Sequence, residues 1–317
     1  MLAMVKVLAV TEYYNESDNI PGLVENLAAQ TQAPDLWLII DDGSTDKSTE
    51  SFESNLKRFE IPYLVYRMPP KKKPNANLKG RAFTKVDILN SDWLESNRFD
   101  YLMLVGADTR FPRTYIELGT KVMEGFPEVG ALAGRIHGEA GSDTPMGTGK
   151  IVRWEVVKET SGRYWDLDPD SLWNIMALNM GYKLVILKDL LARVTRPTHM
   201  YAPSGFYNYG ARMHYVGWSP FLAIIYTFVL AARGTHPLHF LRGYLHEFTK
   251  RDWRVRDPEI VDFYGLRRMI RRALGLVPMR DRATIVTLGI DKETESNLHN
   301  DFLERAISKI RTRISDR

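Results

Sequence analysis

The chain contains no cysteine among its 317 residues. This absence excludes disulfides, zinc sites built on thiolates and a cysteine nucleophile, and it is compatible with a reducing cytosol. The sequence also shows no internal repeat and no low-complexity tract. With 44% hydrophobic residues it can build a core, so it predicts a folded protein of one large or two ordinary domains.

The excess of charge is small. The formal net charge is +4, and residues 250–317 carry 16 Lys and Arg against 11 Asp and Glu. The basic excess therefore lies near the C-terminus, but no aromatic platform accompanies it, so we expect no nucleic-acid partner. The N-terminal stretch MLAMVKVLAV lacks the features of a secretory signal and is more typical of a first strand. The sequence thus predicts a cytoplasmic protein.

Short apolar runs alternate with helical patterns in the first half. The runs are Val5–Val10, Leu36–Ile40, Tyr63–Tyr66, Tyr101–Val105 and Val129–Ala133. Such runs are typical of strands buried on both faces of a mainly parallel sheet. Between them, one helical stripe consists of Ile20, Leu23, Val24 and Leu27, with Ser17 or Asn19 as candidate caps and Pro21 in the first turn. A second stripe consists of Phe52, Leu56 and Phe59.

The stretch LIIDDGSTD places two aspartates directly after a buried strand. In a sheet built from βαβ units, the carboxyl ends of the strands share one edge, and ligands bind there. Asp41 and Asp42 are therefore predicted at the ligand edge. Gly43 allows a sharp turn, and Ser44 or Thr45 is a candidate cap of the next helix.

Two further acidic clusters follow the same logic. Asp108 comes after the strand Tyr101–Val105, and Asp166, Asp168 and Asp170 precede a helical pattern. A set of carboxylates at one sheet edge suits group transfer from a nucleotide diphosphate, because they can bind a base or ribose, hold Mg²⁺ or Mn²⁺, and accept a proton. The segments 69–79 and 134–162 are predicted to be rich in loops.

Four segments together resemble the signature of family 2 glycosyltransferases of the GT-A fold. They are VLAVTEYYNES, LIIDDGSTD, YLMLVGADTRF and DPDSLWNIMALNMGYK, in that order. The resemblance covers roughly residues 5 to 200 and implies an α/β fold, GT-A, with a mainly parallel sheet and flanking helices. It implies an inverting hexosyltransferase that takes the sugar from a UDP- or GDP-sugar.

The resemblance also implies a role for individual residues. Around the nucleotide it places Thr11, Tyr13, Glu12 or Glu16, with Asp41 or Asp42 on the base edge or ribose, and Lys79 and Arg81 of NLKGRA on the base or diphosphate. Asp108 matches the metal-ligating aspartate of the family's Asp-x-Asp motif, while Gly106 replaces the other aspartate. His199 is a second candidate near the metal and diphosphate.

For the catalytic base, the family spacing before the turn at Gly181 indicates Asp170, with Asp168 in reserve. Either residue can also cap the helix that carries Leu172, Ile175 and Met176. The Gln-x-x-Arg-Trp motif of processive synthases is absent downstream of Asp170. We therefore expect a single sugar to be added to a glycan or a lipid-linked acceptor.

The sequence changes character after residue 210. We predict a catalytic region at 1–210 and a helical, basic region at 211–317. The run Val216–Ala232 has no charge and is either a buried, a half-inserted or a spanning helix. A second stripe, Phe263, Leu266, Ile270, Leu274 and Val277, lies beside Arg267, Arg268, Arg271 and Arg272. Peripheral contact with the inner face of the membrane and self-association through a last stripe from Leu298 are both options.

Two rival functions fit parts of the pattern. A sugar-phosphate nucleotidyltransferase uses a related fold, but no glycine-rich, lysine-bearing loop follows the first strand. A non-catalytic protein that binds a nucleotide sugar would explain Gly106. Pyrophosphate as a product would favour the first rival, and donor binding without turnover would favour the second.

Overall fold

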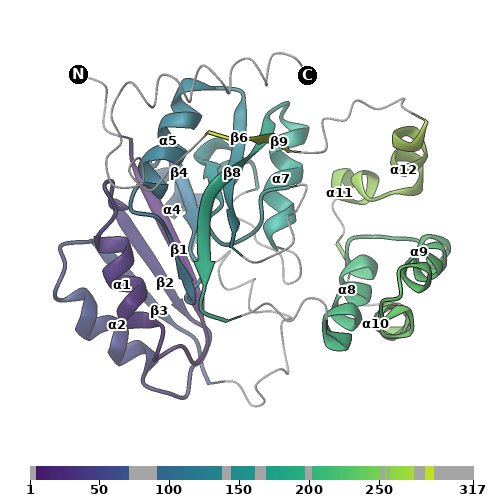
Figure 1. Cartoon of the computed structure of the whole chain (residues 1–317), viewed down its shortest axis with the longest axis horizontal. Helices are drawn as coiled ribbons and strands as arrows, with labels where there is room; N and C mark the ends of the chain where they lie inside the picture. Colours follow the sequence, from purple (N-terminus) through teal and green to yellow (C-terminus); the bar gives the residue numbers. More distant parts are fainter. Residues whose placement is uncertain are drawn as a thin grey trace. The chain divides into compact units, whose positions relative to one another are not determined.

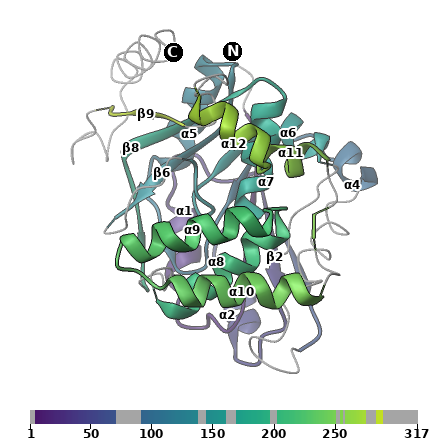
Figure 2. The same ribbon diagram turned by 90° about the vertical axis from the view of Figure 1, so that its right-hand side faces the viewer.

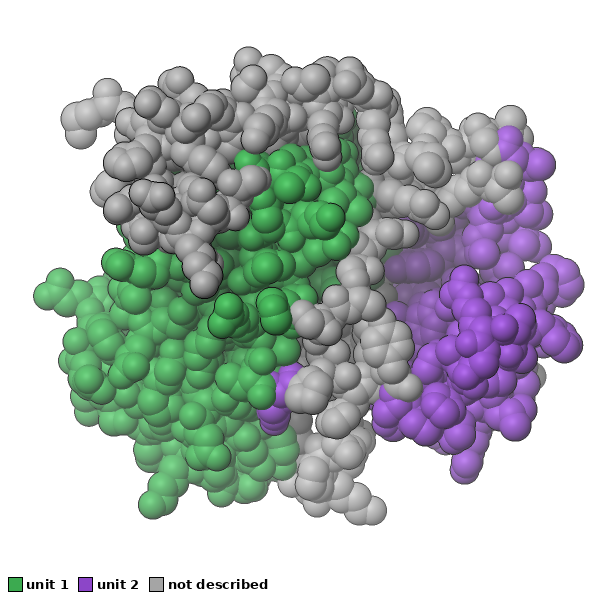
Figure 3. Space-filling view, in the orientation of Figure 1, with its two compact units in different colours: residues 1–195, 282–317 green, residues 196–281 purple. Residues whose placement is uncertain are grey.

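The structure is a computed structural model that describes residues 5–70, 91–137, 144–160, 169–196, 202–250, 254–255, 258–274 and 283–288. The chain has two compact units, which Figure 3 distinguishes by colour. Unit 1 comprises residues 1–195 and 282–317, and unit 2 comprises residues 196–281. The functional division after residue 210 stays a prediction, because compactness does not test where a catalytic region ends.

Unit 1 is built on a mixed, mainly parallel sheet with flanking helices (Figure 1). The strands are β1 (Val7–Tyr13), β2 (Leu36–Asp41), β3 (Tyr63–Arg67), β4 (Tyr101–Leu104), β5 (Thr109–Arg110), β6 (Val129–Ile136), β7 (Ile151–Arg153), β8 (Lys183–Val194) and β9 (Thr284–Val286). Their order is β3-β2-β1-β4-β7-β6-β8-β5, and β9 pairs with β8. All five predicted strands exist, although β1 begins later than predicted and includes Thr11 to Tyr13. Burial on both faces is wrong for β3, which lies at the edge of the sheet with Leu64 and Tyr66 exposed.

The register of the central strands brings their carboxyl ends together. β1 runs parallel to β2 and β4, and Val10 lies opposite both Leu38 and Leu104. At the end of the same pairing, Tyr13 lies opposite Asp41. The antiparallel strands are β7, between β4 and β6, and β5, which pairs with β8. The predicted shared edge of strand ends therefore exists at β1, β2 and β4.

The helices of unit 1 are α1 (Ile20–Ala28), α2 (Ser48–Leu56), α4 (Ser91–Ser96), α5 (Tyr115–Gly125), α6 (Trp154–Glu159) and α7 (Pro169–Asn179). The stripe predicted for α1 is buried, and Pro21 lies in its first turn. The predicted caps are right in position for α1 and wrong for α2. Asn19 stands at the N-cap of α1 without a capping bond, and Lys47 rather than Ser44 or Thr45 precedes α2.

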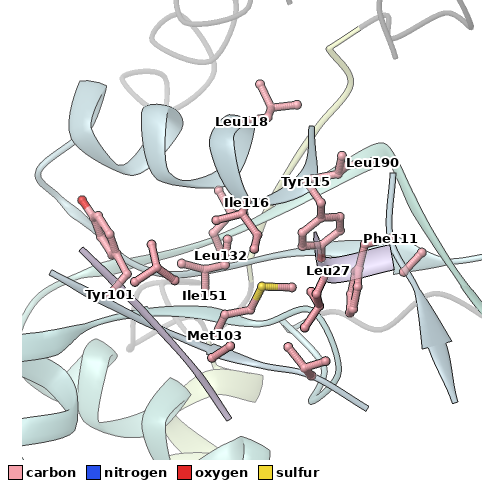
Figure 4. Packing of buried hydrophobic residues seen from close by; sticks show 14 of the residues in the cluster. Leu27, Tyr101, Met103, Phe111, Tyr115, Ile116, Leu118, Leu132, Ile151 and Leu190 are labelled. Atoms are coloured by element: carbon pink, nitrogen blue, oxygen red, sulfur yellow. The ribbon is translucent and has the colours of Figure 1, made fainter. Parts of the chain in front are cut away.

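The region 134–162 is more regular than predicted. It contains the end of β6, the whole of β7 and α6, and the side chains of Ile151 and Val152 are fully buried. The polar turns around them hid this short strand from pattern analysis. Figure 4 shows Ile151 in the core beside Met103 and Leu132, below Ile116 and Tyr115 of α5.

Unit 2 consists of helices in the residues that the structure describes. They are α8 (Pro203–Tyr215), α9 (Pro220–Ala232), α10 (Pro237–Lys250), α11 (Pro258–Phe263) and α12 (Leu266–Ala273). The backbones of α8 and α10 touch, because a Cβ on Gly210 would lie 1.9 Å from the carbonyl oxygen of Phe240. Figure 2 shows α10 alongside α8 and α9. The predicted helical C-terminal portion is thus confirmed.

Two predicted helices of this portion differ from the structure. The charge-free run yields α9, which starts only at Pro220 because Ser219 caps it. Within the described ranges, no helix is both long and apolar enough to cross a membrane. The predicted arginine-rich helix is split at Tyr264–Gly265, so Phe263 ends α11 and is buried, whereas α12 carries the arginines. Val277 and the stripe from Leu298 lie outside the described residues.

Candidate functional site

Two loops at the ends of β1 and β2 are joined by hydrogen bonds. Asn15, in the first loop, adopts a left-handed backbone with φ of 55°, which asparagine tolerates better than most residues. Its backbone N–H donates to Ser44 Oγ at 3.0 Å, and its side-chain Oδ1 accepts from Thr45 N at 2.8 Å. Ser44 and Thr45 therefore fasten the loops together, which explains why they do not cap α2.

Asp46 extends this connection. Its Oδ2 accepts from Ser17 N at 3.2 Å, and its Oδ1 accepts from Ser48 N at 3.0 Å and from the Ser48 hydroxyl. Ser48 Oγ in turn accepts from Glu16 N at 2.7 Å. Burial alone would raise the pKa of Asp46, but the hydrogen bonds from Ser48 and Ser17 outweigh it and hold the pKa below its usual value. Sequence analysis missed Asn15, Asp46 and Ser48 in this role.

Asp41 holds the turn that follows β2. Its Oδ1 accepts from Ser44 N at 2.7 Å, and its Oδ2 accepts from Thr49 Oγ1 at 2.6 Å. The Tyr13 hydroxyl lies 2.9 Å from Thr49 Oγ1. Burial, above all, raises the pKa of Tyr13, so this phenol stays protonated. Two residues after Asp41, Gly43 has φ of 78°, which fits the predicted sharp turn, and a Cβ there would lie 2.4 Å from the carbonyl oxygen of Pro69.

The remaining residues predicted around the nucleotide differ in burial. Thr11 is fully buried and accepts a hydrogen bond from Trp37 Nε1 at 2.9 Å. Asp42 and Glu16 are also largely buried, and Glu16 accepts from Asn19 Nδ2 at 2.7 Å. Glu12 is partly exposed. Tyr13, Glu16, Asp41 and Asp42 are therefore neighbours at one edge, whereas Thr11 lies inside the sheet.

The turn that carries Asp108 is tied to the same edge. The backbone carbonyl of Asp108 accepts a hydrogen bond from Thr195 N at 2.8 Å, where the short β5 pairs with the end of β8. Arg110 donates to the carbonyl of Asn19 at 2.8 Å and thereby reaches the first loop. Burial lowers the pKa of Arg110, and the charge of Asp108 opposes that shift. The Asp108 side chain itself is partly exposed.

Gly106 sits where a side chain would force its neighbours to shift. Its N–H donates to Thr148 Oγ1 at 2.9 Å, and Thr148 Oγ1 donates to Thr109 Oγ1 at 2.9 Å. A Cβ on Gly106 would lie 2.7 Å from Thr109 Oγ1 and 2.9 Å from Thr148 Oγ1. The two threonine hydroxyls thus occupy the space that an aspartate at this position would need.

The structure describes only part of the rest of the predicted site. Asp170 lies in the first turn of α7, where its backbone is described. Lys79, Arg81, Asp168 and His199 lie outside the described residues. Among the residues that are described, no group of three or more His, Asp or Glu side chains is arranged to hold a metal ion. The roles predicted for all of these residues stay predictions.

One contact links α7 to the Asp108 turn. Asn174 Nδ2 donates to the carbonyl of Pro145 at 2.9 Å, and the segment from Pro145 leads directly to Thr148, which holds Gly106. The turn at Gly181 after α7 has φ of 87°, which agrees with the glycine turn expected there. The helix that begins near Asp170 is therefore attached to the turn that presents Asp108.

Comparisons with known proteins agree with this architecture. The profile described as glycosyl transferase family 2 matches residues 9–191, more than half of the chain. A mannosyltransferase from Pyrobaculum calidifontis, solved in complex with GDP-Man and Mn²⁺, aligns with a TM-score of 0.51 and 13% identity over 99% of this chain and 89% of that one. Residues 1–349 of S. aureus TarS, solved with UDP-GlcNAc, align with a TM-score of 0.47 and 16% identity over 98% and 90%.

No curated protein sequence matches this chain. The likeness to the mannosyltransferase shows the fold, and the expected GT-A fold with a mixed, mostly parallel sheet is confirmed. The family match includes the strand ends, both joined loops and the Asp108 turn. This chain belongs to glycosyl transferase family 2 and is a glycosyltransferase.

Proposed function

We propose that this enzyme transfers one sugar from a nucleotide diphosphate donor to a hydroxyl acceptor, with inversion at the anomeric carbon and with Mg²⁺ or Mn²⁺ bound. The main support is the convergence of Tyr13, Asp42 and the Asp108 turn at adjacent strand ends in a family 2 chain. Ligands of parallel sheets bind outside such ends. A nucleotide would thus find carboxylates and loop backbone at one edge.

Of the two aspartates at the end of β2, Asp42 is our candidate for contact with the nucleobase or ribose. Both oxygens of Asp41 already accept hydrogen bonds from Ser44 and Thr49, so Asp41 would act by holding the turn. Thr11 is fully buried and accepts a hydrogen bond from Trp37, so it would support the strand end from inside the sheet and would not touch the nucleotide. Glu12 and Glu16, on either side of Tyr13 in the sequence, are further candidates for contact with the nucleobase. For the diphosphate we retain Lys79 and Arg81.

Asp108 is our candidate ligand for the cation, with His199 as a second. Mg²⁺ and Mn²⁺ are often held by one or two carboxylates together with substrate phosphate oxygens, so a single protein carboxylate fits such a site. The space filled by Thr109 and Thr148 around Gly106 also favours one aspartate rather than two. When bound, the cation would offset the charge of the leaving diphosphate. The Mn²⁺ in the related mannosyltransferase is consistent with this choice.

For the transfer itself, we assign the base to Asp170, with Asp168 in reserve. The carboxylate would accept the proton of the acceptor hydroxyl as its oxygen bonds to the anomeric carbon. The bond between that carbon and the donor phosphate oxygen breaks in the same step, and the nucleoside diphosphate leaves with the electron pair. One displacement inverts the configuration, and no covalent enzyme intermediate is needed.

The acceptor in this proposal is a glycan or a lipid-linked hydroxyl at the cytoplasmic face of the membrane. Residues 1–210 would bind the donor and catalyse, and residues 211–317 would shape the acceptor side. The support is compositional, because unit 2 (196–281) has 13 Lys and Arg against 6 Asp and Glu. Self-association of the chain through residues 211–317 is the alternative role for this region.

The test is thermal unfolding with UDP, GDP and dTDP and their sugars, each with and without Mn²⁺. A donor at about 100 times its Kd adds roughly 2.7 kcal/mol to the free energy of unfolding, so one base should raise the melting temperature in a metal-dependent way. Asp108→Ala should abolish the metal-dependent part, whereas the exposed control Glu60→Ala should keep it. No shift with any nucleotide would contradict donor binding at this edge.

The product completes the test. With the donor identified, NMR of the glycoside should show the anomeric configuration opposite to that of the donor sugar. Retention would contradict single displacement. Release of pyrophosphate would point instead to nucleotidyl transfer, and donor binding without turnover for every acceptor would contradict the transfer step.

A further inference from the structure

Helix α9 is apolar around its whole circumference. It contains no charged residue from Pro220 to Ala232. One side packs inside unit 2, where Leu222, Ala223 and Leu230 are buried and Tyr226 contacts Trp218 and Phe240. A helix that is apolar all round is normally buried on every side, either in a core or in lipid.

The other side of α9 is exposed. Phe221, Ile224, Ile225 and Phe228 recur at the spacing of a single helix face, and Phe228 is 71% exposed. Unit 2 as a whole shares this property, since ten of the fourteen large apolar side chains that are exposed among the described residues belong to it. So dense a set of exposed apolar side chains indicates a binding surface.

Helix α12 presents a second exposed stripe. Leu266, Ile270 and Leu274 lie one turn apart, and Leu274 is 66% exposed. The exposed Arg267 and Arg271 stand beside them. In Figure 1, α9 lies to the right of α8 and α12 lies to the right of α11, so the two helices are on the same side of unit 2.

Charge favours one kind of partner for this side. Unit 2 carries a net charge of +7, whereas the remainder of the chain carries −3. Apolar side chains beside arginines match an anionic bilayer, whose headgroups attract guanidinium groups while its acyl chains accept phenylalanine and leucine. A second copy of the chain would bring +7 against +7, which repels at low salt.

We propose that the exposed faces of α9 and α12 dock unit 2 onto an anionic lipid bilayer. The side chains of Phe221 and Phe228 enter the acyl region, and Arg267 and Arg271 contact headgroup phosphates. Because α9 has 13 residues, it lies along the interface and does not cross it. This docking does not depend on the transfer reaction, but it would bring the enzyme to a lipid-linked acceptor.

The test is flotation of the full chain with vesicles of phosphatidylglycerol and phosphatidylcholine, against vesicles of phosphatidylcholine alone. We expect binding to the anionic vesicles that falls with added salt. Arg267→Gln with Arg271→Gln should weaken partition about 30-fold, because each arginine near an anionic surface contributes roughly a factor of five. The matched control is Lys57→Gln with Arg58→Gln, which removes two exposed cations from unit 1 and should change partition by less than about threefold.

A second pair of variants tests insertion. Phe221→Ser with Phe228→Ser should weaken partition at least about 100-fold, since each removes a buried phenyl group from lipid. Leu64→Ser, at an exposed apolar site of unit 1, should leave partition unchanged. Circular dichroism and the thermal unfolding midpoint of each variant, both measured without nucleotide, establish that it is folded, so the outcome is independent of the donor site.

Three results would overturn the proposal. The first is no flotation with anionic vesicles at low salt, and the second is flotation that neither variant pair changes. The third is that something other than a bilayer covers this surface. A concentration-dependent dimer in sedimentation velocity, or binding of polyglutamate but not of vesicles, would show this if the phenylalanine variants abolish it.

Discussion

At the scale of single residues, Gly106 illustrates how a departure from a family pattern can be fixed by its neighbours. Its backbone donates to Thr148, and the hydroxyls of Thr148 and Thr109 fill the position of its missing side chain. Its φ is not in the left-handed region, so an L-residue is acceptable there as far as the backbone is concerned. Only the lack of space argues against a larger residue.

We therefore expect Gly106→Ala to destabilise the protein by about 1–3 kcal/mol through overpacking. The measurement is the midpoint of urea unfolding. In the double variant with Thr109→Ala the added methyl group gains room, so the two substitutions should cost less together than the sum of their separate effects. Simple additivity would show that the threonine hydroxyl does not set the limit.

The catalytic base is a second question at this scale. Asp170→Asn should reduce the turnover rate about 100-fold or more, as is typical for the loss of a general base, while donor affinity stays within about threefold. Steady-state kinetics and calorimetry with the donor separate the two effects. Asp168→Asn serves as the comparison. A normal rate for Asp170→Asn together with a low rate for Asp168→Asn would move the base to Asp168.

At the scale of elements, the loops after β1 and β2 act as one piece. Their connection depends on Asn15 and Asp46, whose side chains accept hydrogen bonds from the backbone of the opposite loop. Pattern analysis located both loops but interpreted Ser44 and Thr45 as caps, because a hydroxyl before a helix is usually local. A bond between residues about 30 positions apart leaves no periodic trace in one sequence.

Asp46 gives this connection a pH dependence. Its pKa in the folded protein lies below the unfolded value of about 3.9, so its contribution to stability is present above that pH and is lost as pH falls through the folded pKa. Asp46→Asn should remove this part of the acid destabilisation, by less than about 1 kcal/mol because the group is exposed. Urea unfolding at pH 3 and pH 6 measures it, and identical pH dependence in both proteins would contradict the assignment.

Helices and strands could be predicted from the sequence where their buried residues recur with a regular period. They could not be predicted where burial depends on neighbouring strands. The stripe of α1 and four of the five apolar strands are visible because residues such as Leu23 and Ile39 face the core. The fifth, β3, was predicted as a strand, but its edge position leaves Leu64 and Tyr66 exposed. The short β7 escaped, since three residues carry no period and their burial depends on β4 and β6. At the site, the position of Asp41 and Asp42 after a buried strand was visible in the sequence. The hydrogen bonds from Ser44 and Thr49 that hold Asp41 were not.

At the scale of the whole molecule, two separate surfaces are expected to respond to two ligands. Donor with Mn²⁺ should slow backbone hydrogen exchange in 11–19 and 41–48, by up to about 100-fold at 100 times Kd. Anionic vesicles should instead slow exchange in 220–232 and 266–274. Exchange measured by mass spectrometry distinguishes these segments. Protection of 41–48 by vesicles alone would show that the lipid acts at the donor edge.

The pairing of β9 with β8 has a consequence for how the chain can be cut. Unit 2 is the crossover between two parallel strands, a position that a single helix fills in most βαβ units. The strand after this crossover brings Val286 and Leu288 into the core, and Leu288 N–H donates to Asp189. A chain ended at residue 281 would keep all of unit 2 yet leave the backbone of β8 uncovered, as an open edge for other strands to join.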